Sequence, residues 1–75
     1  MANKNFDELV IGKNYSANSG RIYFVCNSFI EITNSETVFF AVMLNSTTIF
    51  KFDKNGRCLE NIKDRENQNL VMCIF

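Results

Sequence analysis

The residues of this chain best suited to chemistry with a partner are arginines and tyrosines that lie next to turns. Arg21 follows a glycine, and Arg57 follows an Asn-Gly pair. A guanidinium binds carboxylate or phosphate bidentately, and Tyr and Arg are enriched at interface hot spots. We therefore predict a binding site drawn from six residues: Tyr15, Arg21, Tyr23, Asp53, Lys54 and Arg57. For each arginine the alternative is an ordinary solvated charge at a strand end.

Groups that could support catalysis are scarce. The chain has no His, the commonest general base and metal ligand. It has no Gly-x-Ser-x-Gly elbow, phosphate-binding loop or dinucleotide fingerprint. The neighbouring carboxylates at 7–8 and 64–66 lie in polar segments, which favours solvated surface charge because two catalytic carboxylates need a shared cleft. The sequence predicts a protein that is not an enzyme and uses no cofactor.

Three cysteines are widely spaced, at Cys26, Cys58 and Cys73. An odd number at these distances fits neither a disulfide framework nor a zinc site. Cys26 and Cys73 lie in apolar runs, where a free cysteine usually behaves as a small buried hydrophobe. Cys58 follows Arg57, whose positive charge would lower the pKa of a nearby thiol. A reactive thiol at Cys58 is therefore the alternative to plain burial.

The charges are balanced, with eight basic and eight acidic residues. Proteins that bind nucleic acid through phosphate contacts usually carry a basic excess, so this balance argues against a nucleic-acid partner. No apolar run follows the first lysine as in a signal peptide, and none approaches the roughly 20 residues of a membrane-spanning helix. We expect a cytoplasmic protein with reduced cysteines and no membrane contact.

A strand over residues 37–44 is the element around which the others must be arranged. Successive side chains of a strand point to opposite faces, and here both sets are apolar. One set is Val38, Phe40, Val42 and Leu44, and the other is Phe39, Ala41 and Met43. Such a run indicates a central strand or a strand with a second face that meets a partner.

Short alternating segments on both sides of this run predict further strands. They cover residues 13–16, 21–26, 29–33, 47–53, a return strand from Cys58, and 70–75. Residues 21–33 form one bent strand with a bulge at Asn27-Ser28, or two separate strands. Asn55-Gly56 is typical of a primed hairpin turn, and residues 60–69 form a solvated loop or one helical turn.

The N-terminal segment has two interpretations. Asn3 or Asn5 caps one short helical turn through residues 7–9, or the segment is an arm that lays Phe6, Leu9 and Ile11 over one end of the core. The whole pattern predicts one small all-β domain over residues 1–75, a curled antiparallel sheet or barrel of five to six strands.

A domain of this size buries only roughly 60% of the surface that its unfolded chain exposes. The central and C-terminal apolar runs hold more apolar side chains than so thin a barrel can cover, and exposed apolar patches usually mark interaction surfaces. We therefore predict a homo-oligomer or partner interface made by these residues: Phe39, Met43, Met72, Ile74 and Phe75.

Several turn motifs together resemble small orphan proteins of bacteriophages and prophages. They are Gly12-Lys13-x-Tyr15, Gly20-Arg21, Phe52-Asp53-x-Asn55-Gly56-Arg57-x-Leu59 and Asn69-Leu70-Val71. The chain departs from that pattern where Asn69 replaces the usual Asp and where four apolar residues follow Val71. The resemblance implies an SH3-like barrel in the host cytoplasm and an accessory role, often the blocking of a host or defence protein, without catalytic residues.

Two functional hypotheses follow. The first is a non-enzymatic binding module, a phage-type inhibitor that docks on a host or defence protein through apolar strands and a rim of Tyr and Arg. The alternative is an oligomer that sequesters a small anionic ligand, such as a signalling nucleotide, between Arg21, Arg57 and Tyr15.

Overall fold

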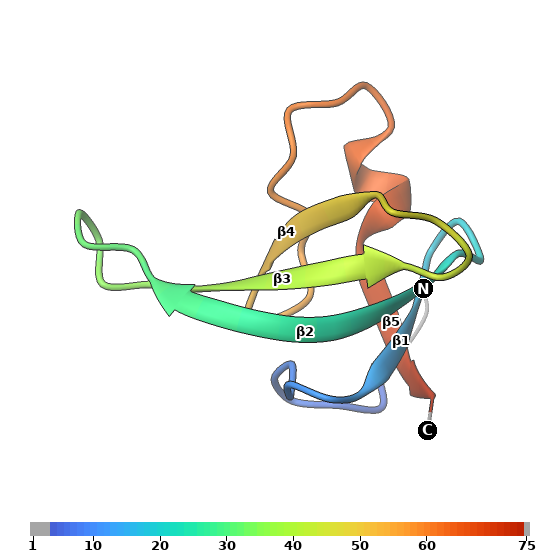
Figure 1. The fold of residues 1–75 in the computed structure, drawn as a ribbon, viewed down its shortest axis with the longest axis horizontal. Helices are drawn as coiled ribbons and strands as arrows, with labels where there is room; N and C mark the ends of the chain where they lie inside the picture. Colours follow the sequence, from blue (N-terminus) through green and yellow to red (C-terminus); the bar gives the residue numbers. More distant parts are fainter. Residues whose placement is uncertain (1–3, 75) are drawn as a thin grey trace.

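Five antiparallel strands form one curled half-barrel sheet in the computed structural model, which describes residues 4–74 (Figure 1). The strands are β1 (Asn14–Ala17), β2 (Ile22–Ile30), β3 (Thr37–Met43), β4 (Ile49–Asp53) and β5 (Leu70–Ile74), in the order β4-β3-β2-β1-β5. One 3-10 turn, η1 (Arg65–Gln68), precedes β5. The prediction of an all-β fold with five to six strands is confirmed.

The long strand β2 joins the two halves of the sheet. It pairs with β1 near its start and with β3 along most of its length. The register with β3 shifts between Val25 and Asn27, so Cys26 is the extra residue of a bulge. A bulge bends a strand and increases its twist, which lets β2 follow the curl. The bent-strand interpretation is confirmed, with the bulge one residue earlier than expected and the strand ending at Ile30 instead of Thr33.

The gap between the edge strands β4 and β5 is bridged by the segment that follows β4. Asp53 N donates to Arg57 O at 2.9 Å, and Leu70 N donates to Gly56 O at 2.7 Å. The expected return strand from Cys58 is reduced to one isolated bridge with Phe52. The turn also differs from the primed type, because Gly56 alone has a positive φ, of 89°, and Asn55 does not.

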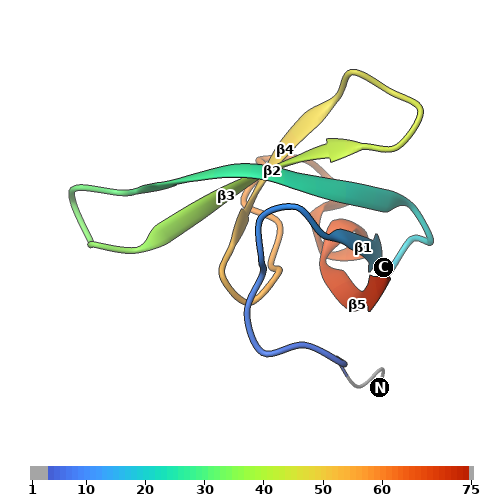
Figure 2. The same ribbon diagram turned by 60° about the horizontal axis from the view of Figure 1, so that its bottom comes forward.

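The N-terminal segment is an arm and not a helical turn over its described residues. Leu9 is buried and its backbone N donates to Lys54 O at 2.9 Å. The Phe6 ring packs edge-on against Tyr15 at 4.9 Å between centroids, whereas Ile11 is exposed. Figure 2 shows the segment passing beside the turn that follows β4. No helix starts near Asn5, because Phe6 and Leu9 pack against the core instead; Asn3 lies outside the described residues.

The core lies on the concave side of the sheet. Its buried members are Leu9, Tyr15, Ala17, Tyr23, Val25, Phe39, Ala41, Phe52, Cys58 and Leu70. Among residues 4–74, every buried side-chain nitrogen or oxygen has a hydrogen-bond partner. The Tyr23 hydroxyl donates to Gln68 Oε1 at 2.8 Å, which ties η1 to β2.

Candidate binding surfaces

Both tyrosines expected at the binding rim lie in the core. Tyr15 is 1% exposed and Tyr23 is 0% exposed. The Tyr15 hydroxyl accepts a hydrogen bond from Val10 N at 2.8 Å, and burial raises the pKa of both phenols above the ordinary value. The expectation of a tyrosine rim is corrected: the alternation of β1 and β2 turns these rings inward, where their hydroxyl groups have partners.

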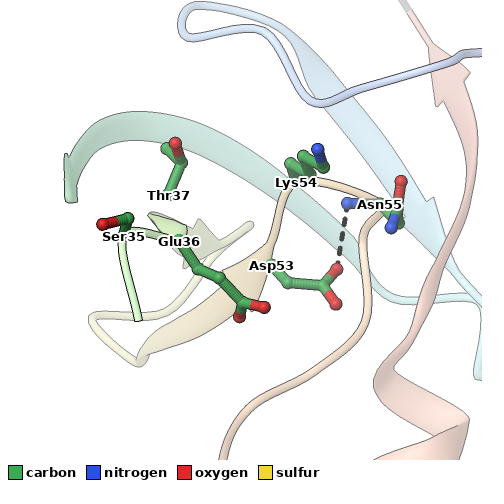
Figure 3. A pocket seen from close by; sticks show the side chains of 6 residues that line it. All are labelled: Ser35, Glu36, Thr37, Asp53, Lys54 and Asn55. Carbon is green, nitrogen blue, oxygen red and sulfur yellow. Dashed lines mark hydrogen bonds between the residues drawn. The ribbon is translucent and has the colours of Figure 1, made fainter. Parts of the chain in front are cut away.

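Asp53 and Lys54 border a small polar hollow, together with Ser35, Glu36, Thr37 and Asn55 (Figure 3). The Asp53 carboxylate accepts hydrogen bonds from the backbone N of Asn55 and Arg57, both at 2.9 Å, as in a turn stabilised by an Asp side chain. Figure 3 shows the Lys54 ammonium pointing away from the carboxylates of Asp53 and Glu36. The volume of about 170 Å³ is below the range of sites for drug-sized ligands.

The two arginines make separate contacts. Arg21 Nη1 donates to the Met43 sulfur at 3.2 Å. Arg57 borders a hollow with Arg65, Glu66 and Asn69. Within one chain, Arg21, Arg57 and Tyr15 therefore do not surround one ligand. Arg65 was not among the predicted site residues, because only the position of η1 beside the turn after β4 brings it close to Arg57.

The cysteines remain separate and free. Cys58 is buried, and this burial raises the pKa of its thiol above the ordinary value. That direction is opposite to the one expected from the neighbouring Arg57, because desolvation of the thiolate outweighs the nearby positive charges. In the described part of the chain, no three His, Cys, Asp or Glu side chains are placed to hold a metal ion. Over the same residues, no helix combines the length and apolar character needed to span a membrane.

The convex side of β2, β3 and β4 carries an apolar surface, which we call the outer face. By strand register it consists of Phe24, Phe29, Val38, Phe40, Val42 and Ile49, of which Val38 is buried. Phe24 pairs with Val42, which pairs with Ile49, so these three form one row across the strands. Phe24 is 41% exposed and Ile49 is 54% exposed. Phe29 and Phe40 pack against each other at 5.3 Å between ring centroids.

The interface residues predicted on β3 belong to the opposite side. Phe39 pairs with Phe52 and is buried in the core, and Met43 packs against that core. The prediction of an interface at Phe39 and Met43 is corrected: these alternate side chains of β3 point to the concave side of the sheet, where the core lies. On β5, Met72 is exposed and Ile74 is partly buried, while Phe75 lies outside the described residues.

The turn between β2 and β3, which we call the hairpin tip (residues 30–36), projects away from the rest of the molecule (Figure 1). Ile32 is 96% exposed and Ile30 is 66% exposed. Glu31 N donates to Glu36 O at 2.7 Å, and Ser35 N donates to Glu31 O at 2.8 Å. The two isoleucines were predicted to be ordinary strand residues, because alternation alone does not reveal that the hairpin extends past the core.

No protein-family model, curated protein or solved structure matches this chain. Its own geometry distinguishes the surfaces described above. The hollow at Asp53 is small and polar, whereas the outer face and the hairpin tip are apolar and exposed. The two apolar surfaces are thus the ones suited to a macromolecular partner.

Proposed function

We propose that this protein is a non-enzymatic binding module, an inhibitor of the phage type that docks on a host or defence protein through its hairpin tip. The observation that carries the proposal is Ile32, which is 96% exposed at the end of a projecting hairpin. Scattered surface isoleucines are normal. A second exposed isoleucine, Ile30, lies two residues away in the same tip, so the pair forms an apolar anchor.

The tip is held in one conformation by its own hydrogen bonds. Besides the two backbone bonds, Thr33 Oγ1 donates to Glu31 Oε1 at 3.0 Å and Glu36 N donates to Asn34 Oδ1 at 3.1 Å. Ser35 adopts a positive φ of 58°, which closes the turn. An anchor that is already ordered loses little conformational entropy on binding. This supports the insertion of the hairpin tip into a pocket of the partner protein.

The charges beside the anchor indicate the kind of surface that it would enter. Glu31 and Glu36 lie on either side of Ile32 along the chain, and no basic residue occurs within the hairpin tip. Complementary charges favour correct docking and repel wrong partners. The proposed partner therefore offers an apolar pocket with a basic rim.

The experiment begins with native mass spectrometry of the protein isolated gently from the cells that naturally produce it. The polypeptide that co-purifies is identified, made separately and titrated by calorimetry with the wild type and with Ile30→Asp/Ile32→Asp. We expect the variant to bind at least about 30-fold more weakly, as for a hot spot of about 2 kcal/mol.

The matched control is Ile62→Asp, which changes an exposed isoleucine in the loop before η1 and should leave the affinity unchanged. Full binding by the tip variant, or the same loss in the control, would remove the tip from the site.

One observation favours the alternative, sequestration of a small anionic ligand. Arg57 and Arg65 border the same hollow, although the Glu66 carboxylate there partly offsets their charge. A ligand bound only by the folded state raises the melting temperature. A panel of signalling nucleotides tests this alternative, with Arg57→Ala/Arg65→Ala as the control: a shift that the variant abolishes supports it, and no shift with any nucleotide refutes it.

A further inference from the structure

We propose that the hollow between Arg57 and Arg65 binds a phosphate group, with the Asn69 side-chain amide as a third donor. We call it the arginine hollow; Arg57, Arg65, Glu66 and Asn69 border it. This inference rests on the alternative function, the binding of a small anion, and names the group that is bound. It is independent of the hairpin tip, since η1 lies well away from that tip (Figure 1).

Neither guanidinium group of the arginine hollow is paired within residues 4–74. No carboxylate of these residues forms a salt bridge with Arg57 or Arg65, although Glu66 borders the same hollow. The two arginine side chains also make no hydrogen bond with the described residues. Two cations that share a hollow repel each other, and an anion between them replaces this repulsion with attraction. A guanidinium matches the oxygen atoms of phosphate with two parallel donors.

Asn69 adds a donor that the fold fixes in place. Its Oδ1 accepts a hydrogen bond from Cys58 N at 2.8 Å. The nitrogen of the same amide, Nδ2, has no hydrogen-bond partner among the described residues. It is open to solvent, because every buried side-chain nitrogen in this part of the chain has a partner. An amide that is held at its oxygen and unpaired at its nitrogen can donate to an anion in the hollow.

The backbone on both sides of the arginine hollow is held by hydrogen bonds. Arg57 N donates to Asp53 Oδ1 at 2.9 Å, and Arg57 O accepts from Asp53 N at 2.9 Å. Asn69 N donates to Glu66 O at 3.3 Å, and Asn69 O accepts from Asn18 N at 2.9 Å. Donors on a fixed backbone lose less conformational entropy when a ligand binds. The donors of the hollow are thus positioned before a ligand arrives.

The charge and the volume of the hollow favour a single phosphate group. A second hollow adjoins it, shares Arg57 and Asn69 as lining residues and adds Lys4. Three cations and one carboxylate, that of Glu66, therefore line the two hollows, although the charges of the whole chain are balanced. The arginine hollow has a volume of about 190 Å³, below the roughly 300 Å³ at which sites for drug-sized ligands begin. It can hold the phosphate group and leaves the remainder of a phosphorylated ligand outside.

The test is an NMR titration of the isotope-labelled full chain with sodium phosphate at constant ionic strength, since salt alone screens exposed charges. We expect the backbone amides of Arg57 and Arg65 and the side-chain amide of Asn69 to shift together and to saturate, with a Kd on the order of 1 mM.

Asn69→Asp keeps the oxygen that accepts from Cys58 N, but it replaces the donor with a second oxygen and adds a negative charge. Phosphate should therefore bind at least about tenfold more weakly. The matched control is Asn27→Asp, because Asn27 Oδ1 likewise accepts from a backbone N, that of Ser28 at 2.8 Å, and lies outside the arginine hollow. Glu66→Gln removes the carboxylate from the hollow and should tighten binding about threefold.

The absence of a saturable shift at these amides up to about 20 mM phosphate overturns the proposal. So does a folded Asn69→Asp variant, checked by circular dichroism, that binds phosphate as well as the wild type, or a Glu66→Gln variant that binds it more weakly. If Asn69→Asp does not fold, Arg65→Ala takes its place, because the Arg65 side chain makes no hydrogen bond or ion pair with the described residues.

A second titration with adenosine monophosphate, and with adenosine as its control, identifies the source of the phosphate group. Tighter binding of the monophosphate than of inorganic phosphate supports a nucleotide as the ligand. Equal affinities support a site for the phosphate group alone, so the phosphate site would stand while the sequestration of a nucleotide would fail. The hairpin tip is tested separately by Ile30→Asp/Ile32→Asp.

Discussion

The two sides of β2, β3 and β4 are built from the same strands and have similar apolar character, yet they have opposite environments. The concave side holds Tyr23, Phe39 and Phe52, all buried. The convex side holds Phe24 and Ile49, which stay in contact with water. The difference shows that apolar content does not decide which side forms the core. The curl of the sheet decides it, because the N-terminal arm, the segment after β4 and η1 close the concave side through Leu9, Cys58 and Gln68.

The largest expected loss of stability comes from a substitution on the core side, which we compare with one on the outer face. Phe52→Ala removes a ring with no exposed surface, and such changes cost about 3–5 kcal/mol of unfolding free energy. Phe24→Ala removes a ring that is already 41% exposed, and we expect a loss of less than about 1.5 kcal/mol. Urea denaturation measured at low micromolar concentration checks both values. Equal losses would contradict the assignment of the two sides.

A smaller loss of stability is expected at Gly56, in the segment after β4 that closes the concave side. A Cβ at Gly56 would lie 2.9 Å from Leu70 O, and this residue has a φ of 89°. Gly56→Ala therefore combines backbone strain with a clash against β5, and we expect a loss of about 2–4 kcal/mol. Gly20→Ala is the matched control, because Gly20 has a φ of 91° but no atom within 4 Å of its Cβ position. Its loss should stay near the roughly 1–2 kcal/mol of the strain alone; equal losses would show that the contact with Leu70 does not matter.

The smallest expected effect comes from the titratable groups of the core side, and it changes the stability only at alkaline pH. Burial raises the pKa of Tyr15, Tyr23 and Cys58 above the ordinary values of 10.0, 10.0 and 9.0. Above pH 9–10 the unfolded chain loses these protons while the folded chain retains them, so the free energy of unfolding falls as the pH rises. Below pH 9 the contribution is fully present and the stability should not depend on these groups.

Urea denaturation between pH 7 and pH 11 measures this dependence. Cys58→Ala should remove the part of the decline that begins near pH 9, and Cys26→Ala, at an exposed cysteine, is the matched control. A stability that is constant up to pH 11 would contradict the burial of these groups.

Much of the fold could be predicted from local signals. The strand over residues 37–44, the bulge near Asn27 and the turn at Gly56 follow from alternation and turn chemistry, which act between near neighbours. The N-terminal arm was one of two interpretations, because an Asn before acidic residues also suits a helix cap. Its docking depends on Phe6 meeting Tyr15 and on Leu9 meeting Lys54, contacts that no local pattern contains.

The candidate site was less predictable. Asp53 and Lys54 do lie together, because they are adjacent in one turn. Tyr15 and Tyr23 were expected at a rim because tyrosine is enriched at interface hot spots, but a tyrosine also suits a core when its hydroxyl group has a partner. Hydrogen bonds with Val10 N and Gln68 give their hydroxyl groups partners, so both rings can lie in the core. Ile32 gave no signal of its own, since its exposure depends on how far the β2–β3 hairpin extends past the other strands.

The sequence by itself determined that the chain forms short antiparallel strands with two-sided apolar character and balanced charge. These properties depend on residue types and on the two-residue period of a strand, which are local. Only the tertiary structure decided that Phe39 faces the core and Phe40 faces outward. When both sets of side chains on an alternating strand are apolar, the two-residue period shows which residues share a face. It does not show which face meets the core. That depends on non-local pairing and on the direction in which the sheet curls.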